Sequence, residues 1–286
     1  SHLLDVLVSA KSYMEELGVH VEACSNEASA AAMLGASQVY PMRGAVTWKS
    51  IVGTNVASDA LSHLASGGVK GGALIIIGED YGEGSSIIQE RSLAVALKSS
   101  MWLVDPRPNL TSMVDMVEHG FALSEASNTP VMMQLRIRAC HVQGEFVARD
   151  NVKPKIGGIH KLAEPAAFSY DRLAHPPSTF VHEHAKVSDR RPAAQDYIRK
   201  HKLNEVFKGT RNAPLGLILQ GGLYNTVMRQ LCELGLADDY GNSALDLLVL
   251  NVTNPLVGDE IEDFCRGKDA VLVIEEARRS FSSSRF

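Results

Sequence analysis

Carboxylates that could carry acid–base chemistry occur early in the chain. Ser25, Asn26 and Glu27 follow Val19 and Val21, which predict a short strand, and they open an alanine-rich stretch with helical spacing. A carboxylate in the first turn of a helix is stabilised by the helix dipole, and the small residues after it would let another group pack closely. Composition alone therefore favours an ordinary first-turn acid over an acid–base group.

A second set of acids, Glu79, Asp80 and Glu83, follows the apolar run 72–78. Open α/β sheets bind ligands at the carboxyl ends of their strands, although three acids in a turn are more often simply solvated. Gly82 and Gly84 also resemble the start of a dinucleotide-binding turn, but Ile87 stands where the third glycine belongs. A tight turn between strand and helix is the favoured interpretation.

Other polar groups give weaker signals. Gly221-Gly222 is an equally incomplete glycine motif, for which a tight turn is again favoured. His182 and His184 would share one face of an extended segment, but a metal needs further ligands and none stands at a telling spacing, so solvated histidines are expected. The four cysteines are far apart in sequence and are expected to be free thiols; they are Cys24, Cys140, Cys232 and Cys265.

The elements that must position these residues alternate along the chain. Apolar runs predict strands at 44–48, 72–78, 131–135, 215–219, 247–250 and 270–274. Helical patterns lie at 3–17, at 60–65 with Asp59 as cap, at 109–123 and at 223–234, and another is capped by Ser25 or Asn26 and ends at Gly35. Strands that alternate with helices predict βαβ units, so the expected fold is α/β with mostly parallel sheets.

Composition sets limits on function. The chain has 286 residues, is 45% hydrophobic and carries a net charge of −5. These values are typical of a folded globular protein and make nucleic acid or an anionic membrane an unlikely main partner. No apolar run approaches the roughly 20 residues that cross a bilayer, and no signal peptide opens the chain, so a cytoplasmic location is expected.

The segment 151–192 breaks the alternation with proline- and glycine-rich sequence and little apolar periodicity. Such a stretch indicates a long surface connection. We therefore expect two doubly wound α/β domains, at residues 1–150 and 196–286, joined by a connecting segment at 151–195.

Several ordered segments carry a family resemblance. They are 26–30, 34–37, 43–49, 53–59, 78–80, 85–86, 89–92, 125–132, 221–225, 250–256 and 271–276. The first half resembles the pyrimidine-binding region of the indolepyruvate ferredoxin oxidoreductases, thiamine diphosphate enzymes of the 2-oxoacid:acceptor group. The second half resembles the transketolase-C-like domain that adjoins it.

The resemblance implies a role for Glu27. In this family the matching acid hydrogen-bonds N1′ of the cofactor's aminopyrimidine and thereby favours the imino tautomer that accepts the thiazolium C2 proton, while the thiazolium serves as electron sink. That role requires a carboxyl group partly withdrawn from water. Asn55, Ser85, Ser86 and Gln89 are expected at the rim of the cofactor or substrate site, because their loops follow strands where ligands gather. Arg91 is a candidate to meet a substrate carboxylate, although an arginine on a helix surface is the commoner outcome.

The implied reaction is oxidative decarboxylation of an arylpyruvate, such as indolepyruvate, with CoA to acyl-CoA, passing electrons to ferredoxin. The family's Gly-Asp-Gly…Asn motif for Mg²⁺ and diphosphate and its [4Fe-4S] cysteine motifs are missing here. The sequence is therefore interpreted as a fragment or subunit that does not turn over alone, forms a homodimer and needs partners that carry those motifs. The alternatives are a non-catalytic nucleotide-binding or electron-transfer module and a structural subunit with a decayed pocket.

Overall fold

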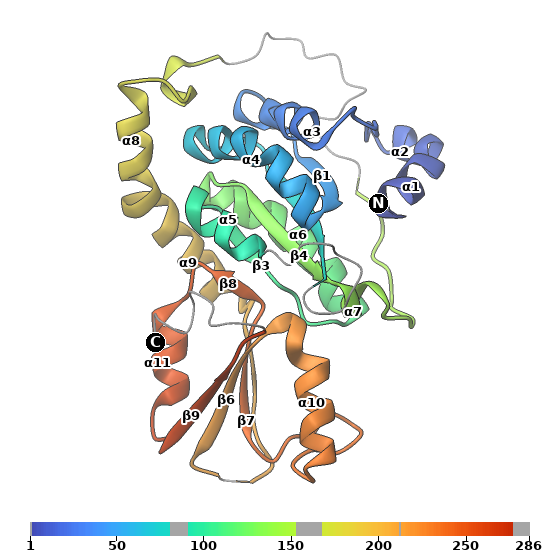
Figure 1. The fold of residues 1–286 in the computed structure, drawn as a ribbon, viewed down its shortest axis with the longest axis vertical. Helices are drawn as coiled ribbons and strands as arrows, with labels where there is room; N and C mark the ends of the chain where they lie inside the picture. The colour runs from blue at the N-terminus through green and yellow to red at the C-terminus, as the bar shows by residue number, and fades with distance from the viewer. Residues whose placement is uncertain (1, 81–90, 153–167, 212, 277–286) are drawn as a thin grey trace.

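The strands of the protein form two sheets in a computed structural model that describes residues 2–80, 91–152, 168–211 and 213–276. The first sheet has the order β1-β2-β4-β3-β8 and the second β5-β7-β6-β9. In Figure 1 the second sheet lies below the first, and a helical arm runs down one side between them. The first sheet's strands are β1 (Gly44–Lys49), β2 (Ala73–Glu79), β3 (Trp102–Val104), β4 (Val131–Arg136) and β8 (Val252–Asn254); the second's are β5 (Glu205–Phe207), β6 (Leu215–Gln220), β7 (Asp246–Leu250) and β9 (Ala270–Ile274).

Both sheets are mostly parallel. The pairs β1–β2, β2–β4 and β3–β4 are parallel, as are β6–β7 and β6–β9, whereas β8 and β5 pair antiparallel with β3 and β7. All six strands predicted from apolar runs are confirmed, and the α/β fold class with them. The three strands that were not predicted have three residues each, too few for a visible pattern. Because β8 belongs to the first sheet, the chain after residue 250 returns to it.

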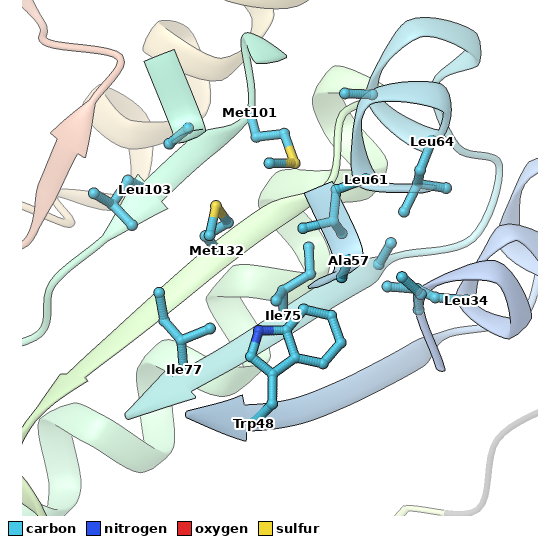
Figure 2. Close-up of a cluster of buried hydrophobic side chains, with 14 of the residues drawn as sticks. Leu34, Trp48, Ala57, Leu61, Leu64, Ile75, Ile77, Met101, Leu103 and Met132 are labelled. Carbon is cyan, nitrogen blue, oxygen red and sulfur yellow. The ribbon is translucent and has the colours of Figure 1, made fainter. Parts of the chain in front are cut away.

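Helices cover both faces of the first sheet. One face is covered by α3 (Glu27–Leu34), α4 (Ser50–Gly67) and α5 (Ser92–Ser99), whose buried side chains meet Ile75, Ile77 and Met132 (Figure 2). The other face is covered by α6 (Leu110–Ser127) and α9 (Arg191–His201). In the second sheet, α10 (Tyr224–Glu233) packs on one face and α11 (Gly258–Cys265) on the other. This layering is the doubly wound arrangement that the sequence predicts.

Local signals set several helix ends. Asn26 caps α3, because its Oδ1 accepts a hydrogen bond from Ser29 N at 2.8 Å, and Asn109 caps α6 in the same way through Ser112 N at 3.2 Å. Both helices were predicted, although α6 continues four residues beyond the expected end. It stops at Asn128, which adopts the left-handed conformation with φ 51°.

The predicted start of α4 is wrong. The helix begins at Ser50, directly after β1, and Asp59 lies in its interior rather than at its cap. The glycine and polar residues at 53–55 resemble a turn in isolation. In the fold Gly53 and Thr54 are buried against Trp48, whose Nε1 donates to Thr54 Oγ1 at 3.2 Å. Tertiary packing overrides the weak helix propensity of these residues.

The N-terminal segment also differs from prediction. The expected helix at 3–17 is two short helices, α1 (His2–Ser9) and α2 (Lys11–Glu16), and neither contains a buried residue. Residues 19–21 form no strand. An apolar residue pair alone does not make a strand where no neighbouring strand is placed to pair with it.

The segment predicted to connect the two domains, 151–195, is helical from residue 178 onwards, although its sequence shows little apolar periodicity. After the short turns Ile137–Cys140 (α7) and Tyr170–Arg172, the chain forms α8 (Ser178–Ala185), a π-helical turn Lys186–Arg190 and then α9. Buried Arg190 stabilises this arm by donating to Ala65 O at 2.8 Å and Ser66 O at 3.0 Å, the carbonyls at the end of α4. The domain division at 150 and 195 stays a prediction.

The histidine pair of this arm is helical, not extended. His182 is buried, and its Nδ1 lies 3.2 Å from Ser66 Oγ, while its Nε2 contacts the Asp171 carbonyl. His184 is exposed. The two imidazoles therefore do not share a face. Within the described ranges no cluster of histidine, cysteine or acidic residues could hold a metal, and no helix is long and apolar enough to span a bilayer.

Gly53 permits the close approach of α4 to β1, so enlarging it should destabilise the fold. A Cβ at this position would lie 2.7 Å from Trp48 Cβ. We expect Gly53→Ala to lower the free energy of unfolding by about 1–3 kcal/mol, measured by urea denaturation. Gly35→Ala is the control, because a Cβ at Gly35 meets nothing within 4 Å; it should change stability by less than about 1 kcal/mol. Equal losses would contradict the packing argument.

Asp246, at the start of β7, makes stability depend on acidity. Gly209 N donates to its Oδ1 at 2.8 Å, and Lys268 and Lys208 lie 2.9 and 3.3 Å from its Oδ2. The backbone hydrogen bond and the lysines lower the pKa of Asp246 from 3.8 to about 2. Since the folded-state pKa is depressed, the stabilisation is complete above about pH 4 and is lost as the pH falls towards 2.

We therefore expect Asp246→Asn to cost ~2 kcal/mol at pH 7 and progressively less below pH 4. Urea unfolding of both proteins at pH 7, 4 and 2.5 checks this. A difference between wild type and variant that does not change with pH would show that the charge of Asp246 is not what stabilises β7.

Candidate functional site

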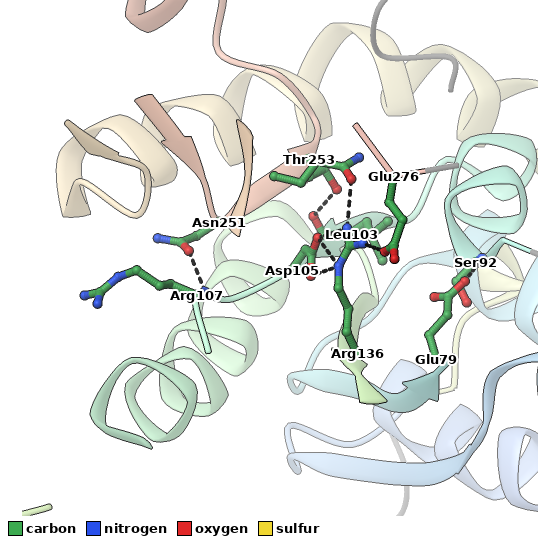
Figure 3. Close-up of polar contacts among 10 residues, drawn as sticks. Glu79, Ser92, Leu103, Asp105, Arg107, Arg136, Asn251, Thr253 and Glu276 are labelled. Atoms are coloured by element: carbon green, nitrogen blue, oxygen red, sulfur yellow. Dashed lines mark hydrogen bonds and ion pairs between the residues drawn. The ribbon is translucent and has the colours of Figure 1, made fainter. Parts of the chain in front are cut away.

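The carboxyl ends of β1 to β4 lie along one edge of the first sheet, where open α/β sheets bind ligands. β1 ends at Lys49, β2 at Glu79 and β4 at Arg136, while Asp105 directly follows β3. Figure 3 shows Glu79, Asp105 and Arg136 gathered at this edge. The β1–β2 half and the β3–β4 half of the edge differ in what covers them.

At the β1–β2 half, side chains tie the strand ends to the helices that follow. Glu79 is 2% exposed, and its Oε1 accepts a hydrogen bond from Ser92 N, at the start of α5, at 2.9 Å. The buried hydroxyls of Ser50 and Ser92 lie 2.6 Å apart. Lys49 Nζ stands 3.4 Å from Asp80 Oδ2. The acids Glu79 and Asp80, for which solvation was the favoured interpretation, are thus buried: Glu79 links β2 to the start of α5, and Asp80 pairs with Lys49 at the end of β1.

Glu27 is the first residue of α3 and is half-buried. Positions 27, 31 and 34 fall on one face of a helix, and Ala31 and Leu34 on that face are buried in the core beside α4. Among the residues that the structure describes, the Glu27 carboxylate forms no hydrogen bond or ion pair. It is therefore a partly shielded acid with capacity for a partner.

The remaining predicted site residues are distributed unevenly. Asn55 lies on the exposed side of α4, and Arg91 is the half-buried residue just before α5. Ser85, Ser86 and Gln89 lie outside the described residues, as do Gly82 and Gly84. Glu27 and Asn55 stand on helices that pack against each other, while Arg91 adjoins Ser92, the residue bound by Glu79.

The β3–β4 half of the edge is filled by the second half of the chain. Arg136 is 5% exposed and its Nη2 donates to Asp105 Oδ2 at 2.6 Å and to Gln220 Oε1, at the end of β6, at 2.8 Å. Its Nε also donates to Asp105, at 3.1 Å, and its Nη1 is paired with Glu276, just after β9 (Figure 3). Strand ends of both sheets thus meet at one guanidinium.

Two further arginines, which follow strands of the first sheet, donate hydrogen bonds to side chains in the second half of the chain. Arg107 forms a two-point ion pair with Glu205 of β5 at 2.9 and 3.0 Å and lies over the ring of Tyr224, whose pKa burial raises. Arg138 Nη1 donates to Thr226 Oγ1 at 2.7 Å. Asn251 accepts from Arg107 N at 2.8 Å and donates to Glu205 at 2.9 Å. This half of the edge is a protein interface rather than an open site.

Gly221-Gly222 belongs to the same interface. A Cβ at Gly221 would lie 2.6 Å from Asn251 Oδ1, and one at Gly222 would lie 2.5 Å from Arg136 Cδ. Protein atoms therefore occupy the space that a nucleotide phosphate would need at this turn. The favoured interpretation, a tight turn between strand and helix, is confirmed, because a 3₁₀ turn at Gly221–Leu223 joins β6 to α10.

Sequence reasoning missed Asp105, Arg136 and Gln220. The signal was present in part, because each stands at or just after the carboxyl end of a strand, where Asp80 was also considered. The local sequence could not show that these strand ends face one another, because Asp105 and Gln220 lie 31 and 84 residues from Arg136 along the chain.

Comparisons with known proteins identify similar sequences and a similar fold. No protein-family model matches the chain. It is 28% identical over 260 residues to the indolepyruvate oxidoreductase subunit IorA of Methanothermobacter thermautotrophicus, covering 91% of the chain, and 24% identical over 270 residues to that of Pyrococcus horikoshii, covering 92%. The matches cover 40% and 39% of those relatives, so the chain spans about two fifths of their length.

Among solved structures, a 2-oxoglutarate:ferredoxin oxidoreductase from Magnetococcus marinus matches 98% of the chain and 54% of its own, with a TM-score of 0.65 and 16% identity. At that identity the match supports the fold alone. The resemblance inferred from the ordered motifs is confirmed: over nearly its whole length the chain is similar in sequence to indolepyruvate oxidoreductase IorA subunits, and its α/β fold is similar to that of a 2-oxoglutarate:ferredoxin oxidoreductase.

Proposed function

We propose that the chain supplies the pyrimidine-side half of a thiamine diphosphate site in a 2-oxoacid oxidoreductase of the indolepyruvate type. The whole enzyme would convert an arylpyruvate and CoA to acyl-CoA and CO₂ and pass electrons to ferredoxin. The observation that carries the proposal is Glu27, a half-buried carboxylate on the inward face of α3 with no hydrogen-bond partner among the described residues. A weakly shielded acid of this kind is suited to share a proton with a ring nitrogen.

The residues present fit the aminopyrimidine half of the cofactor. Glu27 offers one charged acceptor, while Ala31 and Leu34 on the same helix face are buried in the core and anchor α3 below it. On the same pair of helices Met33, Val52 and Val56 are between 47% and 58% exposed, which favours a site that another segment or chain covers. When bound, thiamine diphosphate supplies the electron sink that decarboxylation of a 2-oxo acid requires.

The other proposed residues have positioning and recognition roles. Glu79 bonds to Ser92 N at the start of α5, so Arg91 lies beside the β1–β2 half of the edge, where a guanidinium can bind a substrate carboxylate at two points. Asn55, Ser85, Ser86 and Gln89 are proposed at the rim. Mg²⁺, the diphosphate contacts and the [4Fe-4S] clusters belong to other parts of the enzyme, and the working unit is proposed to be a homodimer. We propose that this chain alone does not turn over.

Glu27→Gln tests the proposal in the complete enzyme that contains this chain. Glutamine is nearly isosteric but cannot exchange a proton with the ring nitrogen, so kcat should fall by at least about 100-fold. The control is Glu22→Gln, which changes an exposed acid paired with His20 at 3.0 Å and should leave kcat within about twofold. Full turnover by Glu27→Gln would favour a structural subunit with a decayed pocket.

Ligand titration separates the proposal from a nucleotide-binding module. The full-length enzyme should bind thiamine diphosphate with Mg²⁺, measured by calorimetry, and Glu27→Gln should weaken that binding by about tenfold, equivalent to one charge-assisted hydrogen bond. NAD and FAD should give no heat of binding at this site. Tight binding of either dinucleotide that Glu27→Gln leaves unchanged would contradict the proposal.

A further inference from the structure

Arg136 joins the two sheets through a single buried side chain. All three nitrogens of its guanidinium donate: Nε to Asp105, Nη2 to Asp105 and Gln220, and Nη1 to Glu276. Arg136 and Asp105 are 5% and 1% exposed, and the side chain of Glu276 is 28% exposed. Asp105 belongs to the first sheet, whereas Gln220 and Glu276 follow strands of the second.

One other contact between the halves is equally buried: Asn251, which directly follows β7 and is 3% exposed, accepts hydrogen bonds from Asp105 N and Arg107 N at 2.8 Å each. The other side-chain contacts that involve a charged group are more exposed than the Arg136 cluster. The side chains of Arg107 and Glu205 are 21% and 30% exposed, and the contact between Arg138 and Thr226 lies at the surface. Exposed pairs contribute little to stability, because water and salt screen them. A buried charge is different, since removing its partner leaves an uncompensated charge out of water, which is strongly destabilising.

The backbone of the second sheet is shaped around the cluster. Gly221 and Gly222 follow β6 directly, and a side chain on either would overlap Asn251 or Arg136. Arg136 therefore lies between the two halves. If its side chain were shortened, the halves could not simply move together to fill the space. Loss of Arg136 leaves both a buried Asp105 carboxylate without its guanidinium and a space at the contact.

We propose that Arg136 is a positioning residue that fixes the orientation of the second sheet against the first, so that the chain behaves as one rigid body only while the cluster with Asp105, Gln220 and Glu276 is intact. This inference does not rest on the proposed function. It concerns the β3–β4 half of the edge, and it leaves the surroundings of Glu27, on α3, outside the affected region.

Hydrogen exchange of the whole chain tests the proposal with Arg136→Met, which keeps an unbranched aliphatic stem and removes the guanidinium and its charge. Amide exchange at Asp105, Arg107, Asn109 and residues 220–224 should become at least about tenfold faster, while β1 and β2 keep their wild-type rates. Spin labels at exposed Val114 on α6 and Leu234 after α10, in a variant with its four cysteines replaced, should report a broader distance distribution.

The matched control is Arg149→Met. Arg149 also binds two carboxylates, Asp115 at 2.6 Å and Glu118 at 2.9 Å, but all three belong to the first half and the arginine is 69% exposed. It should change neither readout. If Arg136→Met does not fold, Glu276→Gln serves instead, because it weakens only the contact between sheets and should give a smaller broadening of the same distances.

A neutral pair provides a rescue that a general loss of stability would not show. Arg136→Gln combined with Asp105→Asn keeps hydrogen-bonding groups at both positions and removes the buried charge imbalance. It should narrow the distance distribution relative to Arg136→Met. Unchanged distances in Arg136→Met would overturn the proposal, and so would faster exchange spread evenly over the first sheet, because either result would show that Arg136 does not act specifically on orientation.

Discussion

A buried guanidinium that satisfies acceptors from two sheets is the constraint on which the architecture depends. Burying an arginine is costly unless every donor is paired, and Arg136 meets that condition with Asp105 from its own sheet and Gln220 and Glu276 from the other. Each sheet alone would leave the charge incompletely paired. Complete pairing of this side chain therefore needs acceptors from the second sheet at the ends of β3 and β4, where Asn251, the single residue between β7 and β8, forms a second buried link.

That requirement divides the carboxyl edge of the first sheet. Rossmann-like and related sheets bind ligands at this edge, and here half of it is taken by protein. The remaining half is formed by the ends of β1 and β2, with Lys49, Glu79 and Asp80, and by the start of α5. Because β1 is an edge strand, this half lies at the margin of the sheet rather than in its centre.

The sequence alone predicted the strands and helix starts that depend on residues close together in the chain. Continuous apolar runs identified six strands within one residue at each end, and Asn26 and Asn109 marked two helix starts through side-chain capping. It did not predict elements whose conformation depends on contacts with residues far away in the chain. α4 starts at Ser50 because Trp48 shelters Gly53 and Thr54. The arm at 178–201 is held against α4 because Arg190 donates to carbonyls at the end of that helix and His182 contacts Ser66 there.

The same distinction explains what was and was not foreseen at the site. Glu27 was singled out because its segment resembles a family motif, since its local sequence alone favours an ordinary first-turn acid. Asp105 and Arg136 acquire meaning only when strand ends far apart in the chain converge. The two groups also differ in how they are paired. The buried guanidinium of Arg136 has acceptors for all its nitrogens, whereas the half-buried Glu27 carboxylate forms no hydrogen bond or ion pair with the described residues. The helix dipole can stabilise Glu27 at the start of α3, so what distinguishes this acid is its remaining capacity to accept a hydrogen bond.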